Sequence, residues 1–255
     1  MEERELKDFL DEKADLYNSI SFIETDPIQV PHQFNDTADI EIAAFLTAML
    51  SWGQKKTIIA KAGELISLMP GGPHEFLLEC GEHQLHRFLS FVHRTFNGMD
   101  CIYFLKALQR VYRYHGGMRN LFEQSYAVHG DLFGSMVDFR KTFFEWMDPG
   151  RTAKHIADPS RGATAKRLNM FLRWMVRSDH RGVDFGIWKG IPAHALYVPL
   201  DVHTGGVARK LGLLKRKQND WRAVLELTEK LRQFDRNDPV RYDFALFGLG
   251  SFERF

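Results

Sequence analysis

The stretch Pro199–His203 places a carboxylate where it could do chemistry. Asp201 precedes a segment with Val207 and Leu211 at helical spacing, and aspartate is a preferred residue immediately before a helix. There it would accept hydrogen bonds from the free amides of the first turn, and the helix dipole would keep it ionised. A carboxylate held in this way can stabilise a positive charge or activate a water molecule. The alternative interpretation is that Asp201 only caps the helix.

The residues that follow favour a close approach to this helix start. Gly205 and Gly206 fall in the first turn, where each costs about 1 kcal/mol relative to alanine. Because glycine lets a ligand or another backbone come near, the pair fits a ligand site as well as tight helix packing. His203 could contact a phosphate or orient Asp201, or it could serve only as a local hydrogen-bonding partner.

Helices must position these residues, since the chain shows helical rather than alternating hydrophobic periodicity. Apolar residues recur at i, i+3, i+4, i+7 and i+8 from Ile42 and again from Leu168. The one strand-like run, 195–198, lies between two prolines and is interpreted as an extended connector. We therefore predict an all-α fold. Further helices are predicted at 3–18, 55–69, 84–96, 100–114, 118–128, 131–146, 202–213, 220–233 and 239–249.

Length and composition indicate a folded chain of one domain. The 255 residues are 44% hydrophobic, and no repeat or long linker interrupts them. We expect a single compact unit over 1–255; a division into a helical barrel at 40–180 and a terminal lobe of 1–39 plus 181–255 stays open.

The charges are distributed unevenly although the net charge is only +1. Residues 1–41 hold twelve acids and three bases, whereas residues 151–217 hold fourteen bases and four acids. Such asymmetry permits a basic face for phosphates. Mutual neutralisation of the two segments in the fold is the alternative.

Several classes of protein are disfavoured by composition. The chain begins with charged residues and has no apolar run near the roughly 18 residues that span a bilayer, so we expect a cytoplasmic protein without a membrane partner. Cys80 and Cys101 are too few for a four-cysteine iron–sulfur or zinc site and are predicted to be buried thiols. The histidines show no metal-ligand spacing. We predict no metal, no cofactor and no iron–sulfur cluster, and make no prediction of oligomeric state.

The segment after Asp201 resembles the helix-hairpin-helix superfamily of DNA glycosylases. That superfamily carries an aspartate, a variable residue, a histidine and a helix that leads to leucine-glycine-leucine, and this chain has Asp201, His203 and Leu211-Gly212-Leu213 in the same register. The chain also resembles a bacterial family of unknown function related to these enzymes. The resemblance implies a two-lobed helical fold, with Asp201 as the catalytic carboxylate and Arg209 on the following helix as a DNA contact.

Two further segments resemble the superfamily in order and type. Residues 43–57 are similar to an early helix that ends in a glutamine probing the DNA beside an extruded base, which implies that role for Gln54. Trp52 adjoins this glutamine, and Lys55 and Lys56 would meet phosphates. Residues 243–250 resemble the last helix, which precedes the cluster cysteines in some members.

The lysine of the superfamily has a less regular counterpart. In the bifunctional members a lysine closes a glycine-x-glycine-x-lysine hairpin that binds phosphate and then forms a Schiff base. Residues 160–166 are the nearest match: Gly162 is the only glycine, Thr164 takes the strict lysine position, and Lys166 follows two residues later. The resulting helix-hairpin-helix is degenerate. The long gap from Lys166 to Asp201 resembles the archaeal oxoguanine glycosylases. The alternative is that Lys166 is a solvated or phosphate-facing lysine.

The loop 183–192 carries aromatic residues between these elements. Trp188 could stack on a base, since stacking contributes roughly 1–3 kcal/mol per base, or it could pack on the core.

Together these patterns predict a base-excision repair protein that cleaves the N-glycosidic bond of a flipped, damaged base in duplex DNA, with Asp201 and Lys166 as catalytic residues. Two alternatives stay open: a non-catalytic nucleic-acid-binding module of the same fold, and a protein-interaction α domain whose acidic first 41 residues engage a basic partner.

Overall fold

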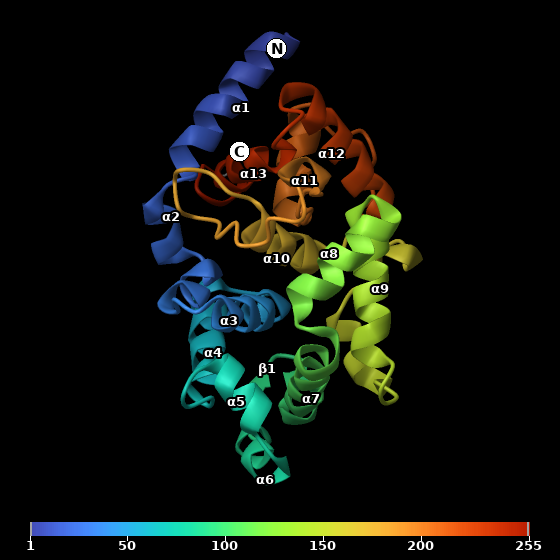
Figure 1. Cartoon of the computed structure of the whole chain (residues 1–255). Coiled ribbons are helices and arrows are strands. Elements are labelled where there is room, and N and C mark those ends of the chain that lie inside the picture. Colours follow the sequence, from blue (N-terminus) through green and yellow to red (C-terminus); the bar gives the residue numbers. More distant parts are fainter. Residues whose placement is uncertain (1, 254) are drawn as a thin grey trace. The chain divides into compact units, whose positions relative to one another are not determined.

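The computed structural model of the chain describes residues 2–253 and 255, and it confirms the all-α class (Figure 1). About 67% of the residues are helical, and the strands β1 (Val92–His93) and β2 (Phe96–Asn97) form the only sheet within the described part. None of the described helices combines the length and the apolar character needed to cross a membrane.

The chain divides into two compact units. One comprises Thr25–Ile156, and the other joins Met1–Glu24 to Ala157–Phe255. The division thus falls at 24/25 and 156/157 rather than at the expected lobe limits 39/40 and 180/181. The difference arises because residues 157–180 are bound to the C-terminal part of the chain. Arg173 forms ion pairs with Asp184 and Asp243, and Arg177 forms ion pairs with Asp184 and Asp238.

Helix α3 (Thr37–Leu50) forms the centre of the Thr25–Ile156 unit. Asp36 caps it by accepting bonds from the amides of Ala38 and Asp39, and every residue from Ile40 to Leu50 is buried. Its Phe45 ring contacts Phe104 at 6.1 Å and Phe139 at 5.5 Å, which joins α3 to α7 and α9. Because α3 is apolar on nearly all of its faces, it can be buried on all sides.

Helices α4 and α5 pack directly against α3, and α8 lies beside α9 (Figure 1). In chain order the elements are η1 (Pro27–Gln29), η2 (Pro31–Gln33), α4 (Lys55–Ser67), α5 (Pro73–Glu79), α6 (Glu82–Leu85), η3 (His86–Phe88), α7 (Gly98–His115), α8 (Met118–His129), α9 (Leu132–Phe144) and η4 (Gly150–His155).

The predicted helix at 84–96 was wrong. The chain forms only the short α6 and η3 there and then turns into the β1–β2 hairpin. One continuous helix would bury Leu89 and Val92 on its apolar stripe, whereas both are about half exposed and Phe91 and Phe96 are buried instead. Gly98 permits this path, because a side-chain Cβ there would lie 2.2 Å from the carbonyl oxygen of Leu89.

In the other unit, α1 (Glu3–Tyr17) and α11 (Val202–Lys210) both pack against α13 (Tyr242–Ser251). Gly248 allows the close approach of α1, since a Cβ there would lie 2.0 Å from the Tyr17 ring. The other elements of this unit are α2 (Ile20–Thr25), which reaches the division, η5 (Pro159–Arg161), α10 (Lys166–Val176), η6 (Ala193–Ala195), α12 (Trp221–Phe234) and η7 (Pro239–Arg241). In the predicted connector 195–198, Ala195 ends the short helix η6, and the backbone is extended from Leu196 onward.

Candidate functional site

Asp201 caps helix α11 and still has one carboxylate oxygen available. Its Oδ1 accepts hydrogen bonds from the amides of His203 and Thr204, each at 2.9 Å. Its Oδ2 lies 3.6 Å from Nζ of Lys166. Capping therefore uses one oxygen and fixes the direction of the other toward an amine.

Lys166 is the first residue of α10, directly after an irregular turn. Gly162 and Ala165 both adopt the left-handed conformation in this turn, at φ +85° and +48°. Asn169 stabilises the turn by donating a hydrogen bond from its side-chain amide to the Thr164 carbonyl at 3.0 Å. The side chains of Lys166 and Asp201 are 28% and 24% exposed, so the pair is accessible without being fully solvated.

Arg209 supports the backbone beneath Asp201 rather than presenting a free guanidinium. Its Nη2 donates to Asn219 Oδ1 at 2.6 Å, and the Asn219 amide donates to the Asp201 carbonyl at 3.1 Å. Gly205 lies against this group, because a Cβ there would come within 2.9 Å of both Arg209 and Asn219. Gly205 is thus explained by packing, whereas Gly206 faces open space. His203 is exposed next to Asp201.

A second carboxylate lies near the lysine–aspartate pair and was missed by the sequence analysis. Asp243, in the first turn of α13, is buried and accepts a hydrogen bond from Nη1 of Arg173. The pKa of Asp243 is raised to about 6, mainly by burial; Arg173 and Lys166 lower it, and the negative charge of Asp201 raises it. These charge effects place Asp243 within electrostatic reach of Lys166 and Asp201.

Arg173 connects Asp243 to a buried ionic network. Its Nε lies 3.2 Å from Asp184, whose other oxygen lies 3.1 Å from Nη1 of Arg177. Arg177 also binds Asp238 at 2.9 Å. This network joins α10 to the loop at 184 and to the connection between α12 and α13. It therefore fixes the position of α10, the helix that begins at Lys166.

The basic segment 151–217 is partly neutralised inside this unit. Besides the pairs with Asp184, Arg177 lies 2.9 Å from Asp179, and Arg181 lies 2.6 Å from Asp15 of the acidic N-terminal segment. Exposed bases of this unit include Lys189, Lys210, Lys215 and Lys217, and Arg161 is exposed but lies 3.6 Å from Asp158. Neutralisation within the fold therefore applies in part, and exposed positive charge remains at Lys189 and after α11.

Trp188 packs in the core of the unit. Its ring is fully buried and meets Phe171 edge to face at 5.3 Å, and its amide donates to the Met175 carbonyl at 2.9 Å. A ring without an exposed face cannot stack on a base in this conformation. The core interpretation accounts for Trp188, and we no longer propose it as a base contact.

The expected contacts on the early helix lie in the other unit. Gln54 and Lys56 are exposed at the start of α4, and Lys55 and Trp52 are half-buried. The Trp52 ring lies 4.9 Å from the His93 ring and 5.9 Å from the His155 ring, to which it is nearly parallel. The structure therefore gathers Lys166, Asp201, His203 and Arg209 in one unit, and Trp52, Gln54, Lys55 and Lys56 in the other.

A buried aspartate stabilises the surroundings of Trp52. Asp100 Oδ1 accepts a hydrogen bond from Thr152 at 2.7 Å, and Oδ2 lies 2.7 Å from Arg151 and 3.3 Å from His155. Burial raises the pKa of Asp100, but the bonds from Asn97 and Thr152 together with the charges of His155 and Arg151 hold it below the usual range. The His155 ring that stacks on Trp52 is thereby held by a fixed negative charge.

The donor set does not suggest a metal centre. Among the described residues, His, Cys, Asp and Glu side chains form no group of three that could hold a metal ion. Cys80 and Cys101 are buried thiols, as predicted.

The chain belongs to a family described as "Protein of unknown function (DUF2400)", which matches residues 26–252. No curated protein and no solved structure matches the chain.

Proposed function

We propose that this member of the DUF2400 family is a DNA glycosylase that cleaves the N-glycosidic bond of an extruded, damaged base. The observation that carries the proposal is the approach of Lys166 Nζ to within 3.6 Å of Asp201 Oδ2, although 34 residues separate them in the sequence. A semi-exposed amine beside an oriented carboxylate is the minimum set for attack on a sugar carbon.

The two groups divide the reaction between them. As the base leaves with the electron pair of the C1′–N bond, positive charge develops on the sugar and the free oxygen of Asp201 stabilises it. Nζ of Lys166, deprotonated by Asp201, then forms a bond to C1′, and the proton passes to the departing base. Asp201 then carries a second proton from Nζ to O4′, the C1′–O4′ bond breaks, and a protonated Schiff base between Lys166 and C1′ results. If water attacks in place of Lys166, the same carboxylate accepts the proton from water.

DNA is the proposed partner because the exposed bases at Lys189 and around the end of α11 could neutralise phosphates. We also propose a cytoplasmic location, since both cysteines are unpaired thiols.

Excision assays with a matched variant test the proposal. The purified chain is incubated with duplexes carrying oxoguanine, uracil, an alkylated base or an abasic site, alongside Asp201→Asn and Asp36→Asn. Asp36 is the matched control, because its Oδ1 also caps a helix through two amides, at 2.9 and 3.2 Å. Asparagine is also a good cap, so both variants should fold.

We expect excision of at least one lesion, a loss of about 100-fold or more in Asp201→Asn, and little change in Asp36→Asn. No excision by the unmodified chain across the panel would overturn the enzymatic proposal. Duplex binding that weakens steeply with salt and survives Asp201→Asn, without excision, would instead support the non-catalytic nucleic-acid-binding module.

A further inference from the structure

We propose that a pocket beside α7 in the Thr25–Ile156 unit binds a nucleotide with a terminal phosphate, with the phosphate on basic residues of α7 and the base on Tyr114. The pocket has a volume of about 380 Å³, at the small end of the range for ligand sites. It involves none of the residues assigned to excision and does not depend on the proposed function.

Three cations of the pocket come from one face of α7. Lys106, Arg110 and Arg113 are spaced i, i+4 and i+7, so their side chains share a stripe of the helix. Glu82 is the one carboxylate among the lining residues, and it lies 2.7 Å from Lys106. The resulting charge of +2 matches a phosphate monoester, which carries about −1.5 to −2 at pH 7, better than a carboxylate or a phosphodiester.

Some of these polar side chains have hydrogen-bond or ion-pair partners within the chain, which gives them a structural role. Gln109 donates to the carbonyls of Leu77 and Cys80, at 2.8 and 3.1 Å, and Arg113 donates to the Leu78 carbonyl; these bonds cap the end of α5. Lys106 pairs with Glu82, which is largely exposed. Within the described chain, neither Arg110 nor Arg113 has a carboxylate at ion-pair distance, so Arg110 in particular has no structural partner of opposite charge.

Aromatic side chains complete the pocket. Tyr114 is 68% exposed, unusual for a large ring, and its face lies 5.1 Å from the Arg110 guanidinium. Trp146 lines the pocket and packs on Tyr103 at 5.0 Å, and its buried indole N–H lacks a hydrogen-bond acceptor. An exposed ring next to a guanidinium favours stacking of a base whose phosphate reaches the same cation.

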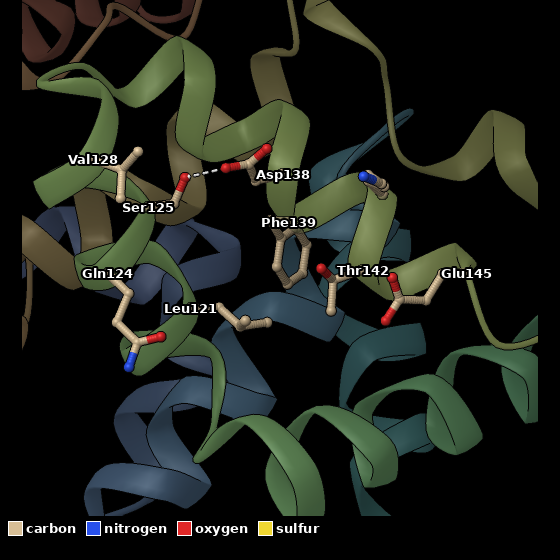
Figure 2. Close-up of a pocket in the computed structure, with 9 residues that line it drawn as sticks. Leu121, Gln124, Ser125, Val128, Asp138, Phe139, Thr142 and Glu145 are labelled. Atoms are coloured by element: carbon tan, nitrogen blue, oxygen red, sulfur yellow. Dashed lines mark hydrogen bonds between the residues drawn. The ribbon is translucent and has the colours of Figure 1, made fainter.

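A second pocket on this unit has a lining of the opposite charge. The hollow between α8 and α9 has a volume of about 330 Å³, and two of its polar side chains bond each other. Ser125 points across to Asp138 and donates a hydrogen bond to it at 2.7 Å (Figure 2), and His129 contacts the same oxygen at 2.8 Å. With Asp138, Lys141 and Glu145 its lining carries a net negative charge, so it would repel a phosphate.

Calorimetric titration of the chain of residues 1–255 tests the inference. The probes are deoxyadenosine 5′-monophosphate, deoxyadenosine, inorganic phosphate, and a short single-stranded oligonucleotide with and without a 5′-phosphate. We expect the monophosphate to bind at least about tenfold more tightly than deoxyadenosine or phosphate, because each of these lacks one half of the contacts. If the oligonucleotide binds only when it carries a 5′-phosphate, the natural ligand is the end of a strand. If neither oligonucleotide binds, the natural ligand is a free nucleotide.

Substitutions locate the binding. Arg110→Gln and Tyr114→Ala should each weaken monophosphate binding about tenfold, and neither side chain caps a helix or lies in the core. Arg119→Gln is the matched control, since Arg119 is an exposed arginine of α8 that lies outside the pocket. No binding of the monophosphate at millimolar concentration, or equal affinity in the chain and in both pocket variants, would overturn the inference.

Discussion

Replacement of Asp243 by asparagine should change how the stability of the chain depends on pH. The folded-state pKa of Asp243 is raised to about 6 from the ordinary value of 3.8, first by burial and then by the charge of Asp201. Asparagine keeps an oxygen that can accept the bond from Arg173 but cannot ionise. The variant therefore resembles the chain with Asp243 protonated.

The sign follows from the protons bound in each state. Between pH 4 and pH 6 the folded chain retains a proton on Asp243 that the unfolded chain has released, so the contribution of Asp243 to the free energy of unfolding falls as pH rises. At 1.36 kcal/mol per unit of pKa difference, the total loss is about 3 kcal/mol, complete just above pH 6. Asp243→Asn lacks this loss, and its stability relative to the unmodified chain should rise by that amount across the same range.

Urea unfolding at intervals between pH 4 and pH 7.5 measures the difference between the two curves. Asp201→Asn provides a second test of the geometry: removal of the Asp201 charge should move the ionisation of Asp243 to lower pH and reduce the slope. Parallel curves for the chain and Asp243→Asn would refute the reasoning. If the variant does not fold, NMR titration of the Asp243 carboxyl carbon replaces it, and a midpoint below pH 4 would be equally contradictory.

Three further substitutions test the packing that positions the site. Gly248→Ala should destabilise the chain by roughly 1–3 kcal/mol, because its Cβ would lie 2.0 Å from the Tyr17 ring, whereas Gly206→Ala, with open space around it in α11, should stabilise by about 0.5–1 kcal/mol; both are measured by urea unfolding. Trp188→Ala should cost about 3–5 kcal/mol, as expected for a buried ring, and a loss below 1 kcal/mol in the same measurement would show that the ring is not part of the core.

The sequence was sufficient to predict features that depend on neighbours along the chain. The helical spacing from Ile42 and Leu168 corresponds to α3 and α10, and the aspartate before Val202 caps α11 as its residue type indicated. The error at 84–96 shows the limit, because Leu89 and Val92 have helical spacing but the buried rings of Phe91 and Phe96 determine the turn. In this segment tertiary packing, rather than local helix propensity, determines the structure.

The candidate site could be predicted only in part, for the same reason. Residue types and order suggested Lys166 and Asp201, but no local pattern shows that their side chains meet. Asp243 and Asn219 act through partners distant in the sequence, Arg173 and the Asp201 backbone. One signal was present: Asp243 is the single charged residue in the apolar run 242–250, and a lone acid in such a run indicates a buried carboxylate with a partner.

The role assigned to Lys166 beside Asp201 is tested most directly by reduction with borohydride in the presence of abasic-site and damaged-base duplexes. We predict a covalent protein–DNA adduct with the unmodified chain that is absent with Lys166→Ala and is retained with Lys7→Ala, which removes a partly exposed lysine of the same unit that has no role in the proposed DNA contact. An adduct of equal yield with Lys166→Ala, or no adduct with the unmodified chain on any of the duplexes, would contradict the role assigned to Lys166.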